Sequence, residues 1–258
     1  MPDRILIRLL ETPADHFRLQ AAQEAIWGPG AFVVADQTLS ACKFGGIALG
    51  AFHEDDMAGF CYGWPAYKDG EVWLHSHLLG VLPAYRNQGL GARLKQAQGE
   101  AALRLGYRRM TWTYDPLEAP NARLNIAKLG GTVREYLVDC YGPLTDTLNR
   151  GLPTDRFLVD LDLLELNLVA PRGREKPRPD GPLINPGGGE PDLSLTAPAV
   201  RLAIPPDFRP AFAAGDHEFV LAWRLRIRTA CLHYFARGYA VTGFAGDCYI
   251  LEREDATV

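Results

Sequence analysis

One stretch of the sequence joins a strand to a helix through a glycine-spaced loop: His77-Leu-Leu-Gly-Val81-Leu-Pro83-Ala-Tyr85-Arg86-Asn87-Gln88-Gly89-Leu90-Gly91-Ala92. The first turn of a helix has unpaired N–H groups and a partial positive charge, and both attract an anion. Gly89 and Gly91 let an anion approach this backbone without meeting a Cβ atom, and Arg86 adds a cation at the rim. The stretch therefore predicts a site for a pyrophosphate group.

Strand and helix patterns alternate on both sides of this loop over residues 1–168. Thr12 and Pro13 are typical of a helix start, and Gly106 is typical of a helix end. Expected strands are 5–10, 47–53, 58–64, 72–81, 110–114, 132–141 and 156–166, and expected helices are 13–26, 89–105 and 120–129. The alternation predicts an α/β domain built around a central mixed (α+β) sheet.

The sequence changes in kind after residue 168. Residues 169–191 are rich in proline and glycine, which predicts a linker. Residues 192–258 form a smaller C-terminal α+β extension, with strands expected at 199–204, 239–244 and 248–252 and a helix at 216–237. One face of that helix carries Phe219, Trp223, Ile227, Ala230 and Tyr234. So long an apolar stripe must be buried, so we expect the extension to pack on the first domain.

Composition excludes several classes of protein. The 258 residues are 47% hydrophobic and 22% charged with a formal net charge of −4, which excludes a disordered chain and makes nucleic acid an unexpected partner. No apolar run approaches the ~20 residues of a membrane span, and no basic head precedes the first apolar residues. The five cysteines are scattered without a CxxC pair, so no metal site is expected. We expect a cytoplasmic protein with reduced thiols.

The longer pattern around the loop, Val81-x-Pro83-x-Tyr85 followed by Arg86-x-x-Gly89-x-Gly91, resembles the acyl-CoA-binding motif of the GNAT superfamily of N-acetyltransferases. The order of the expected elements over residues 1–168 is similar to the order in that family. Residues 115–131 also resemble a poorly characterised GNAT subgroup that carries a C-terminal extension. The resemblance implies a GNAT-like acyl-CoA N-acyltransferase fold and acetyl transfer from acetyl-CoA to an amine.

The resemblance also implies which residues hold acetyl-CoA. Backbone amides of the loop would bind the pyrophosphate, and the end of strand 72–81 would pair with the pantetheine arm like an added strand. A splay between strands 72–81 and 110–114 would admit that arm, and an Asn of helix 120–129 would contact it. The implied residues are Leu79, Gly80, Val81, Arg86, Asn87, Gln88, Gly89, Leu90, Gly91, Ala92, Asn121 and Asn125. Asn121 and Asn125 lie four apart, so we expect them to share a helix face.

Acetyl transfer to an amine requires loss of the amine proton, because a lysine-like amine is protonated at neutral pH. His75 and His77 end the strand that leads to the loop, and their equal parity puts them on the same side. We predict that they supply the base, with sheet packing as the alternative and Glu24 and Glu71 as weaker candidates. The resemblance implies that a backbone N–H of Leu79 or Val81 stabilises the thioester oxygen.

The chain departs from the family at the general acid. Many members carry a Tyr four residues before the glycine that ends the second helix, and here that position, counted from Gly130, is Ile126. Tyr141, Tyr136 or water are the substitutes, so catalysis by Tyr141 is a hypothesis beside its packing in the sheet. The departure leaves a non-catalytic acyl-CoA-binding or sensing module as the alternative function, with an interaction protein as a third.

Two further groups of residues bear on the acceptor, which is a small-molecule or peptide amine in this interpretation. Tyr62, Trp64 and Trp112 line an apolar acceptor pocket or belong to the core. Arg224 and Arg228 attract an acidic substrate or form a solvated helix face. A membrane is not an expected partner, and a homodimer is compatible with the sequence.

Overall fold

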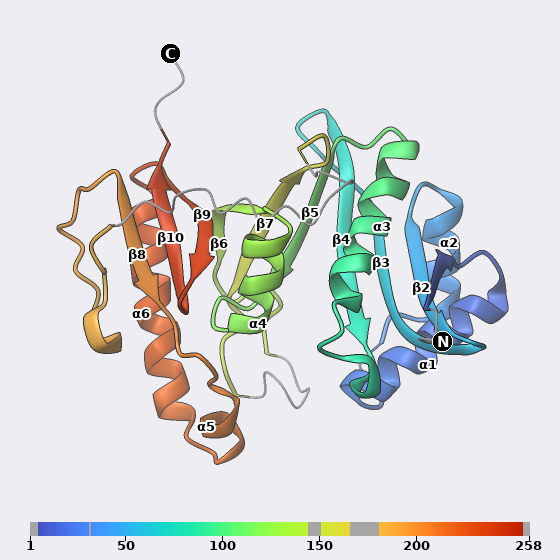
Figure 1. The fold of residues 1–258 in the computed structure, drawn as a ribbon, viewed down its shortest axis with the longest axis horizontal. Coiled ribbons are helices and arrows are strands. Elements are labelled where there is room, and N and C mark those ends of the chain that lie inside the picture. Colours follow the sequence, from blue (N-terminus) through green and yellow to red (C-terminus); the bar gives the residue numbers. More distant parts are fainter. Residues whose placement is uncertain (1–4, 31, 144–150, 166–180, 255–258) are drawn as a thin grey trace. The chain divides into compact units, whose positions relative to one another are not determined.

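The fold is seen in a computed structural model that describes residues 5–30, 32–143, 151–165 and 181–254 (Figure 1). The chain forms two compact units, one made of residues 1–112 and 161–170 and the other of residues 113–160 and 171–258. Residues 113–160 therefore cluster with the C-terminal part of the chain. The expected domain boundaries at 168 and 191 stay predictions.

The first unit is built on the mixed sheet that the sequence predicts. Its strands are β1 Leu6–Leu9, β2 Ile47–His53, β3 Asp56–Lys68, β4 Glu71–Val81 and β5 Arg109–Tyr114, whose last two residues belong to the second unit. They lie in the order β1-β2-β3-β4-β5, and the first four pair antiparallel while β5 runs parallel to β4. Parallel neighbours need a crossover connection, and a helix between β4 and β5 provides it.

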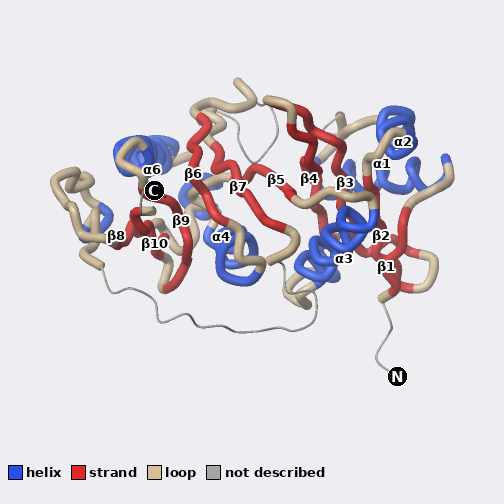
Figure 2. The backbone as a smooth tube through the Cα atoms, turned by 90° about the horizontal axis from the view of Figure 1, so that it is seen from above, coloured by secondary structure: helices blue, strands red, loops and turns tan. Residues whose placement is uncertain are grey.

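Three helices cover this sheet: α1 Pro13–Trp27, α2 Ala35–Lys43 and α3 Leu90–Arg104. Figure 2 shows α1 and α2 on one face of the strands and α3 on the other. Thr12 caps α1 and accepts the N–H of Asp15, whose side chain accepts the N–H of Thr12 in return. Helix α2 was not expected from the sequence, because its N-cap residue is Val34, whose side chain cannot cap a helix.

Apolar side chains between α1 and the sheet form the core of the first unit. Leu19 of α1 and Phe60 and Tyr62 of β3 are fully buried there, and Trp64 packs against the cluster from its edge. Of the two positions considered for Tyr62, the core and an acceptor pocket, the structure therefore shows the core.

The second unit has its own antiparallel strands: β6 Thr132–Leu137, β7 Arg156–Asp162, whose last two residues belong to the first unit, β8 Ala199–Ala203, β9 Tyr239–Ala245 and β10 Cys248–Arg253. Their order is β7-β6-β9-β10-β8. The C-terminal strands join the earlier ones where Val133 of β6 pairs with Val241 of β9. The extension thus continues the sheet that β6 and β7 begin.

Helices of the second unit are α4 Ala119–Ala122, which continues into a π-helical turn at Arg123–Lys128, α5 Arg209–Ala213 and α6 His217–Phe235. Figure 2 shows α4 and α6 on opposite faces of the strands. On α6, Ile227, Ala230 and Tyr234 are buried as predicted, but Phe219 is 43% exposed. Phe219 lies in the first turn, where short helix α5 is the neighbour.

Two other expectations differ from the structure. The strand expected over 132–141 ends at Leu137, because Asp139 adopts a left-handed conformation (φ 48°) and turns the chain. Within the expected linker, residues 169–180 lie outside the described residues, whereas residues 181–191 pack on β8. Asn185 is buried there and exchanges two hydrogen bonds with the backbone of Ala203, of 2.9 and 2.8 Å.

All five cysteines are free thiols, of which Cys61 and Cys231 are fully buried. Within the described part of the chain, no helix combines the length and the apolar character that a membrane crossing requires.

Candidate active site

Strands β4 and β5 pair over only two residue pairs, Leu74 with Met110 and His75 with Thr111. Beyond His75, β4 continues to Val81 while no further pairing to β5 is recorded among the described residues. The backbone of β4 from His77 onward is therefore open on this edge, as the expected splay requires. An extended ligand can use such an edge for main-chain hydrogen bonds.

A β-bulge in β4 lies directly beside this separation. Tyr62 and Gly63 of β3 are consecutive, but they pair with Leu78 and Ser76, so His77 is the extra residue of β4. Bulges are common next to active sites because they redirect a side chain and release backbone groups from the ladder.

The two histidines share one side of the strand, as their parity predicts. Their ring centroids are 6.4 Å apart, and the ring of Trp64 lies 4.5 Å from His77 and 5.6 Å from His75. The Nδ1 atom of His75 is 3.0 Å from the hydroxyl of Thr111, which also accepts the indole N–H of Trp73 at 2.9 Å. The histidines therefore stand in an aromatic strip where β4 and β5 part.

Burial keeps both imidazoles neutral at neutral pH. Burial, followed by the positive charges of His77 and Lys95, lowers the pKa of His75 to about 4. Burial also lowers the pKa of His77, but no neighbouring charge adds to that effect. Both imidazoles are therefore unprotonated at neutral pH, the state that a general base requires.

The opposite face of β4 carries a buried polar cluster under α3. Lys95 is 2% exposed and donates to the hydroxyl of Ser76 at 2.7 Å, while Ser76 donates to Gln98 at 2.6 Å. The ammonium group lies 4.1 Å from the centre of the Trp112 ring, a cation–π contact. Burial lowers the pKa of Lys95 to about 7. Trp112 thus belongs to this cluster and not to an open acceptor pocket.

The loop before α3 has the conformation of an anion site. Asn87 and Gly89 are left-handed, with φ of 62° and 74°, and Gly89 is the N-cap of α3. No side chain caps α3 and no acidic residue stands in its first turn, so the N–H groups from Gly89 to Ala92 have no partner within the helix. By contrast, α1 and α6 are capped by Thr12 and Asp216 and carry acids in their first turns. The donor set at α3 fits a pyrophosphate.

Other residues of the expected cofactor site shape the loop. Arg86 donates from Nε to the carbonyl of Val81 at 3.0 Å, which leaves the rest of its exposed guanidinium at the rim of the loop. Gln88 bonds the carbonyl of Ala84, and Leu90 is buried under the sheet. A Cβ at Gly80 would lie 2.5 Å from Phe60, so this glycine is required by core packing.

The remaining predicted residues belong to the second unit. Asn121 is exposed and Asn125 is 4% exposed, so the expectation that they share one face is wrong. The chain changes from α- to π-helix between them, which alters the angular step that the spacing argument assumes. Tyr141 bonds Thr113 at 2.7 Å, and burial raises its pKa, so its phenol keeps its proton.

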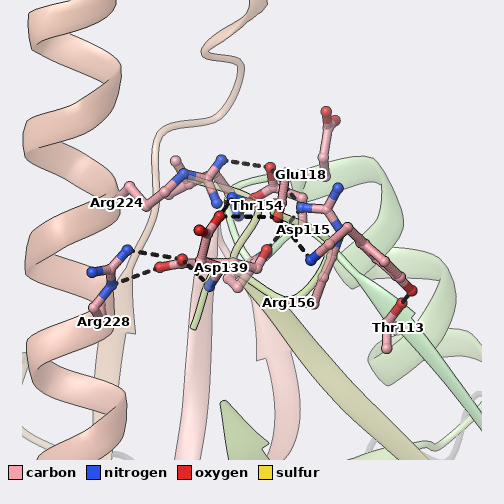
Figure 3. Close-up of polar contacts among 12 residues, drawn as sticks. Thr113, Asp115, Glu118, Asp139, Thr154, Arg156, Arg224 and Arg228 are labelled. Atoms are coloured by element: carbon pink, nitrogen blue, oxygen red, sulfur yellow. Dashed lines mark hydrogen bonds and ion pairs between the residues drawn. The ribbon is translucent and has the colours of Figure 1, made fainter. Parts of the chain in front are cut away.

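The solvated face expected for Arg224 and Arg228 is also wrong. Arg224 is 2% exposed and holds Asp115 through bonds of 2.6 and 3.2 Å, and Arg228 holds the fully buried Asp155 through two bonds of 2.8 Å (Figure 3). Tyr136 also donates to Asp155, at 2.7 Å. These guanidiniums are structural, and Tyr136 is not free to act as an acid.

Sequence reasoning missed Thr111, Trp73 and the Lys95 cluster. Thr111 and Trp73 lie on strands whose pairing the sequence does not reveal. The spacing of Lys95, Gln98 and Ala102 places all three on one helix stripe, but the polar residue types favour a solvated interpretation. Their importance depends on which strands α3 covers.

Residues 15–130 match the acetyltransferase (GNAT) family. The chain carries a GNAT acetyltransferase domain. Among solved structures, an acetyltransferase of the GNAT family from Streptococcus pneumoniae is 20% identical, with a TM-score of 0.51 over 62% of this chain and 99% of that chain. NAA60 of Arabidopsis thaliana, solved with acetyl-CoA, is 16% identical, with a TM-score of 0.50 over 62% of this chain and 99% of that chain.

At these low sequence identities, both structural similarities show a shared fold. No curated protein sequence matches this chain. The GNAT match ends at Gly130 and does not reach the C-terminal extension.

Proposed function

We propose that this GNAT domain transfers an acetyl group from acetyl-CoA to the amine of a small molecule or peptide. The observation that carries the proposal is the uncapped N-terminus of α3 behind two left-handed loop residues, beside a strand edge that is open from His77 to Val81. A helix start of this kind binds phosphate groups, and an open edge binds an extended amide chain. Acetyl-CoA combines both chemistries in one molecule.

Different residues of the chain would bind different parts of acetyl-CoA. Backbone N–H groups from Gly89 to Ala92 hold the pyrophosphate, and the free part of the Arg86 guanidinium adds charge at the rim. The edge of β4 from Leu79 to Val81 orients the pantetheine arm. The thioester then lies where β4 and β5 separate, beside the bulge at His77, whose displaced backbone leaves an N–H of Leu79 or Val81 to stabilise the developing oxyanion.

His77 removes the proton of the acceptor amine, directly or through one water molecule. Neither ring nitrogen of His77 is among the buried, unpartnered polar atoms of the described residues, so the imidazole is reachable. No phenol stands at residue 126, where Ile126 is buried. In this proposal the leaving thiolate takes its proton from water.

One experiment separates this proposal from a sensing module and from an interaction protein. Acetyl-CoA binding is measured by calorimetry, and CoA release is then followed with a panel of amines: peptides with free N-termini, lysine peptides, polyamines and amino acids. Binding together with amine-dependent CoA release supports the transferase. Binding without release for any amine overturns it in favour of the sensing module, and lack of binding overturns both. The oligomeric state, including a homodimer, can be read from the same protein by size-exclusion chromatography.

A further inference from the structure

The two histidines of the candidate site differ in their surroundings although they lie two residues apart. Trp73, His75 and His77 point from the same side of β4, but of the two histidines only His75 takes part in the hydrogen bonds to Thr111 described above. Its ring is tied to Thr111, a residue of β5 that is 1% exposed. His77 contacts the ring of Trp64 and has no recorded hydrogen bond among the described residues.

The hydrogen bonds around Thr111 determine the direction in which its hydroxyl group donates its proton. The indole N–H of Trp73 can only donate, so it gives its hydrogen to the Thr111 oxygen. That hydroxyl has one proton of its own and no other recorded partner than Nδ1 of His75, at 3.0 Å. A buried hydroxyl proton without an acceptor is costly, so Thr111 donates to Nδ1. The ring proton of His75 must then be on Nε2.

We propose that Trp73 and Thr111 are positioning residues that hold His75 as the neutral Nε2–H tautomer, so that His75 is a fixed hydrogen-bond donor to the reacting groups while His77 is the base. This inference rests on the proposed function and assigns the two histidines different tasks. It makes His75 a source of a hydrogen bond to an oxygen of the thioester or of the acceptor, without any change in its protonation.

The position of His75 supports this role. His75 and Thr111 form the last recorded pair between β4 and β5, so the ring stands at the point where the strands part. Its Nε2 atom has no recorded hydrogen bond and is not among the buried, unpartnered polar atoms, so it faces accessible space. The titratable groups around it are His77 on its own strand and Lys95 under the sheet. Positive charge on either one further disfavours a proton on Nδ1.

Nitrogen NMR of the full-length chain tests the tautomer without any need for activity. Histidine is labelled with ¹⁵N, and the signal of His75 is assigned among the six histidines by its loss in His75→Gln. From pH 5.5 to 8.5 we expect a protonated Nε2 and an unprotonated Nδ1, with no titration. In Thr111→Val, which removes the hydroxyl, we expect mixed tautomers or a titration within this range, while Thr111→Ser keeps the wild-type pattern. A proton on Nδ1 in the wild-type protein at pH 7 would overturn the proposal.

Kinetics with a responsive amine test the division of tasks. The amide nitrogen of Gln reaches the position of Nε2, so His75→Gln keeps a donor that cannot titrate. We expect kcat to fall less than tenfold in His75→Gln and more than 100-fold in His75→Leu, with the acid limb of the pH profile present in both. His77→Gln loses that limb. If His75→Gln loses the limb instead, His75 is the base and the proposal fails. If no amine responds, the NMR result still decides the state of His75.

Discussion

At the scale of single residues, burial decides the chemistry of the candidate site. His75, His77 and Lys95 are ordinary titratable groups in the sequence, yet each has a lowered pKa because the sheet and α3 remove water from it. The imidazoles of the proposed site are therefore neutral at neutral pH.

Replacement of His77 tests the base. His77→Ala should lower kcat by about 100- to 10,000-fold, because general-base catalysis contributes that much, while affinity for acetyl-CoA stays nearly unchanged. Since burial lowers the pKa of His77, the wild-type rate should fall only as the pH drops below about 6.5, the ordinary value for histidine. The half-buried His233 of α6, which the proposed chemistry does not use, is the control, and His233→Ala should leave the pH profile intact. A loss in kcat of less than about threefold for His77→Ala would move the base elsewhere.

Burial of Lys95 should lower the free energy of unfolding by an amount that depends on pH. Its pKa of about 7 in the fold, against 10.5 as its ordinary value, means that the unfolded chain binds an extra proton between these values. The free energy of unfolding of the wild type should therefore rise with pH from 7 to 10, with the full penalty present below pH 7. Lys95→Met should be more stable than the wild type by about 2–5 kcal/mol at pH 6, and this gain should shrink toward pH 10.

Urea unfolding at several pH values measures this effect. Lys68→Met, at the exposed end of β3, is the matched control and should show no pH-dependent gain. A difference between Lys95→Met and the wild type that is constant from pH 6 to pH 10 would mean that Lys95 keeps its proton throughout.

At the scale of elements, the N-terminus of α3 and the edge of β4 together form the proposed acetyl-CoA site. A helix that lacks both a capping side chain and a first-turn acid is less stable alone, because its first N–H groups lack partners. A bound anion can supply them. The helix start is thus better suited to a ligand than to the stability of the free protein.

Substitutions at Gly91 test this element directly. Gly91→Val places a branched side chain in the path of the pyrophosphate and should weaken acetyl-CoA binding at least 100-fold, since each charge-assisted bond contributes about 1.5–3 kcal/mol. Gly91→Ala favours the helix and adds only one methyl group, so its effect should be smaller. Calorimetry on both variants, with circular dichroism as the folding control, gives the answer. Equal affinity in folded Gly91→Val and wild-type protein would exclude the loop as the cofactor site.

At the scale of the whole molecule, the C-terminal extension and residues 113–160 form one compact unit. Arg224 and Arg228 of α6 hold Asp115 and Asp155, and Arg209 of α5 pairs with Glu118 (Figure 3). Burial raises the pKa of Asp155, but the bonds from Arg228 and Tyr136 outweigh it and leave that pKa below its usual value. Buried carboxylates of this kind depend on their partners.

Loss of one such partner should destabilise the second unit. Arg228→Ala should lower the free energy of unfolding by about 3 kcal/mol, because it leaves the fully buried Asp155 short of its cation. Arg226 on the same helix pairs with the largely exposed Glu190, so Arg226→Ala should cost less than about 1 kcal/mol. Denaturant unfolding followed by circular dichroism compares them. Similar costs for both variants would mean that the Asp155 pair adds no more than a surface pair.

A shortened chain tests the same point more severely. A protein that ends after residue 170 lacks α6 and strands β8 to β10, so Asp115, Asp155 and the edge of β6 lose their partners. We expect this protein to be insoluble or to show exposed apolar surface by dye binding. Limited proteolysis in the 171–191 stretch gives the opposite test: two fragments that separate as stable, soluble monomers would show that the extension is autonomous.

The sequence alone determined those features that depend on local physics. The loop from Arg86 to Gly91, the start of α1 at Thr12 and the equal sides of His75 and His77 follow from glycine conformations, capping chemistry and strand parity. Such effects act over a few residues, so the sequence is sufficient for them, and the GNAT motif could be found there.

Only the tertiary structure decided what depends on partners distant in the chain. Arg224 and Arg228 look like a solvated helix face until Asp115 and Asp155, more than 70 positions earlier, are placed opposite them. Lys95 looks exposed in the sequence until α3 is placed over Ser76 and Trp112. The hydrogen bond between His75 and Thr111 likewise depends on the pairing of β4 with β5. Burial and hydrogen-bond partners set both charge and tautomer, and neither is a local property of the sequence.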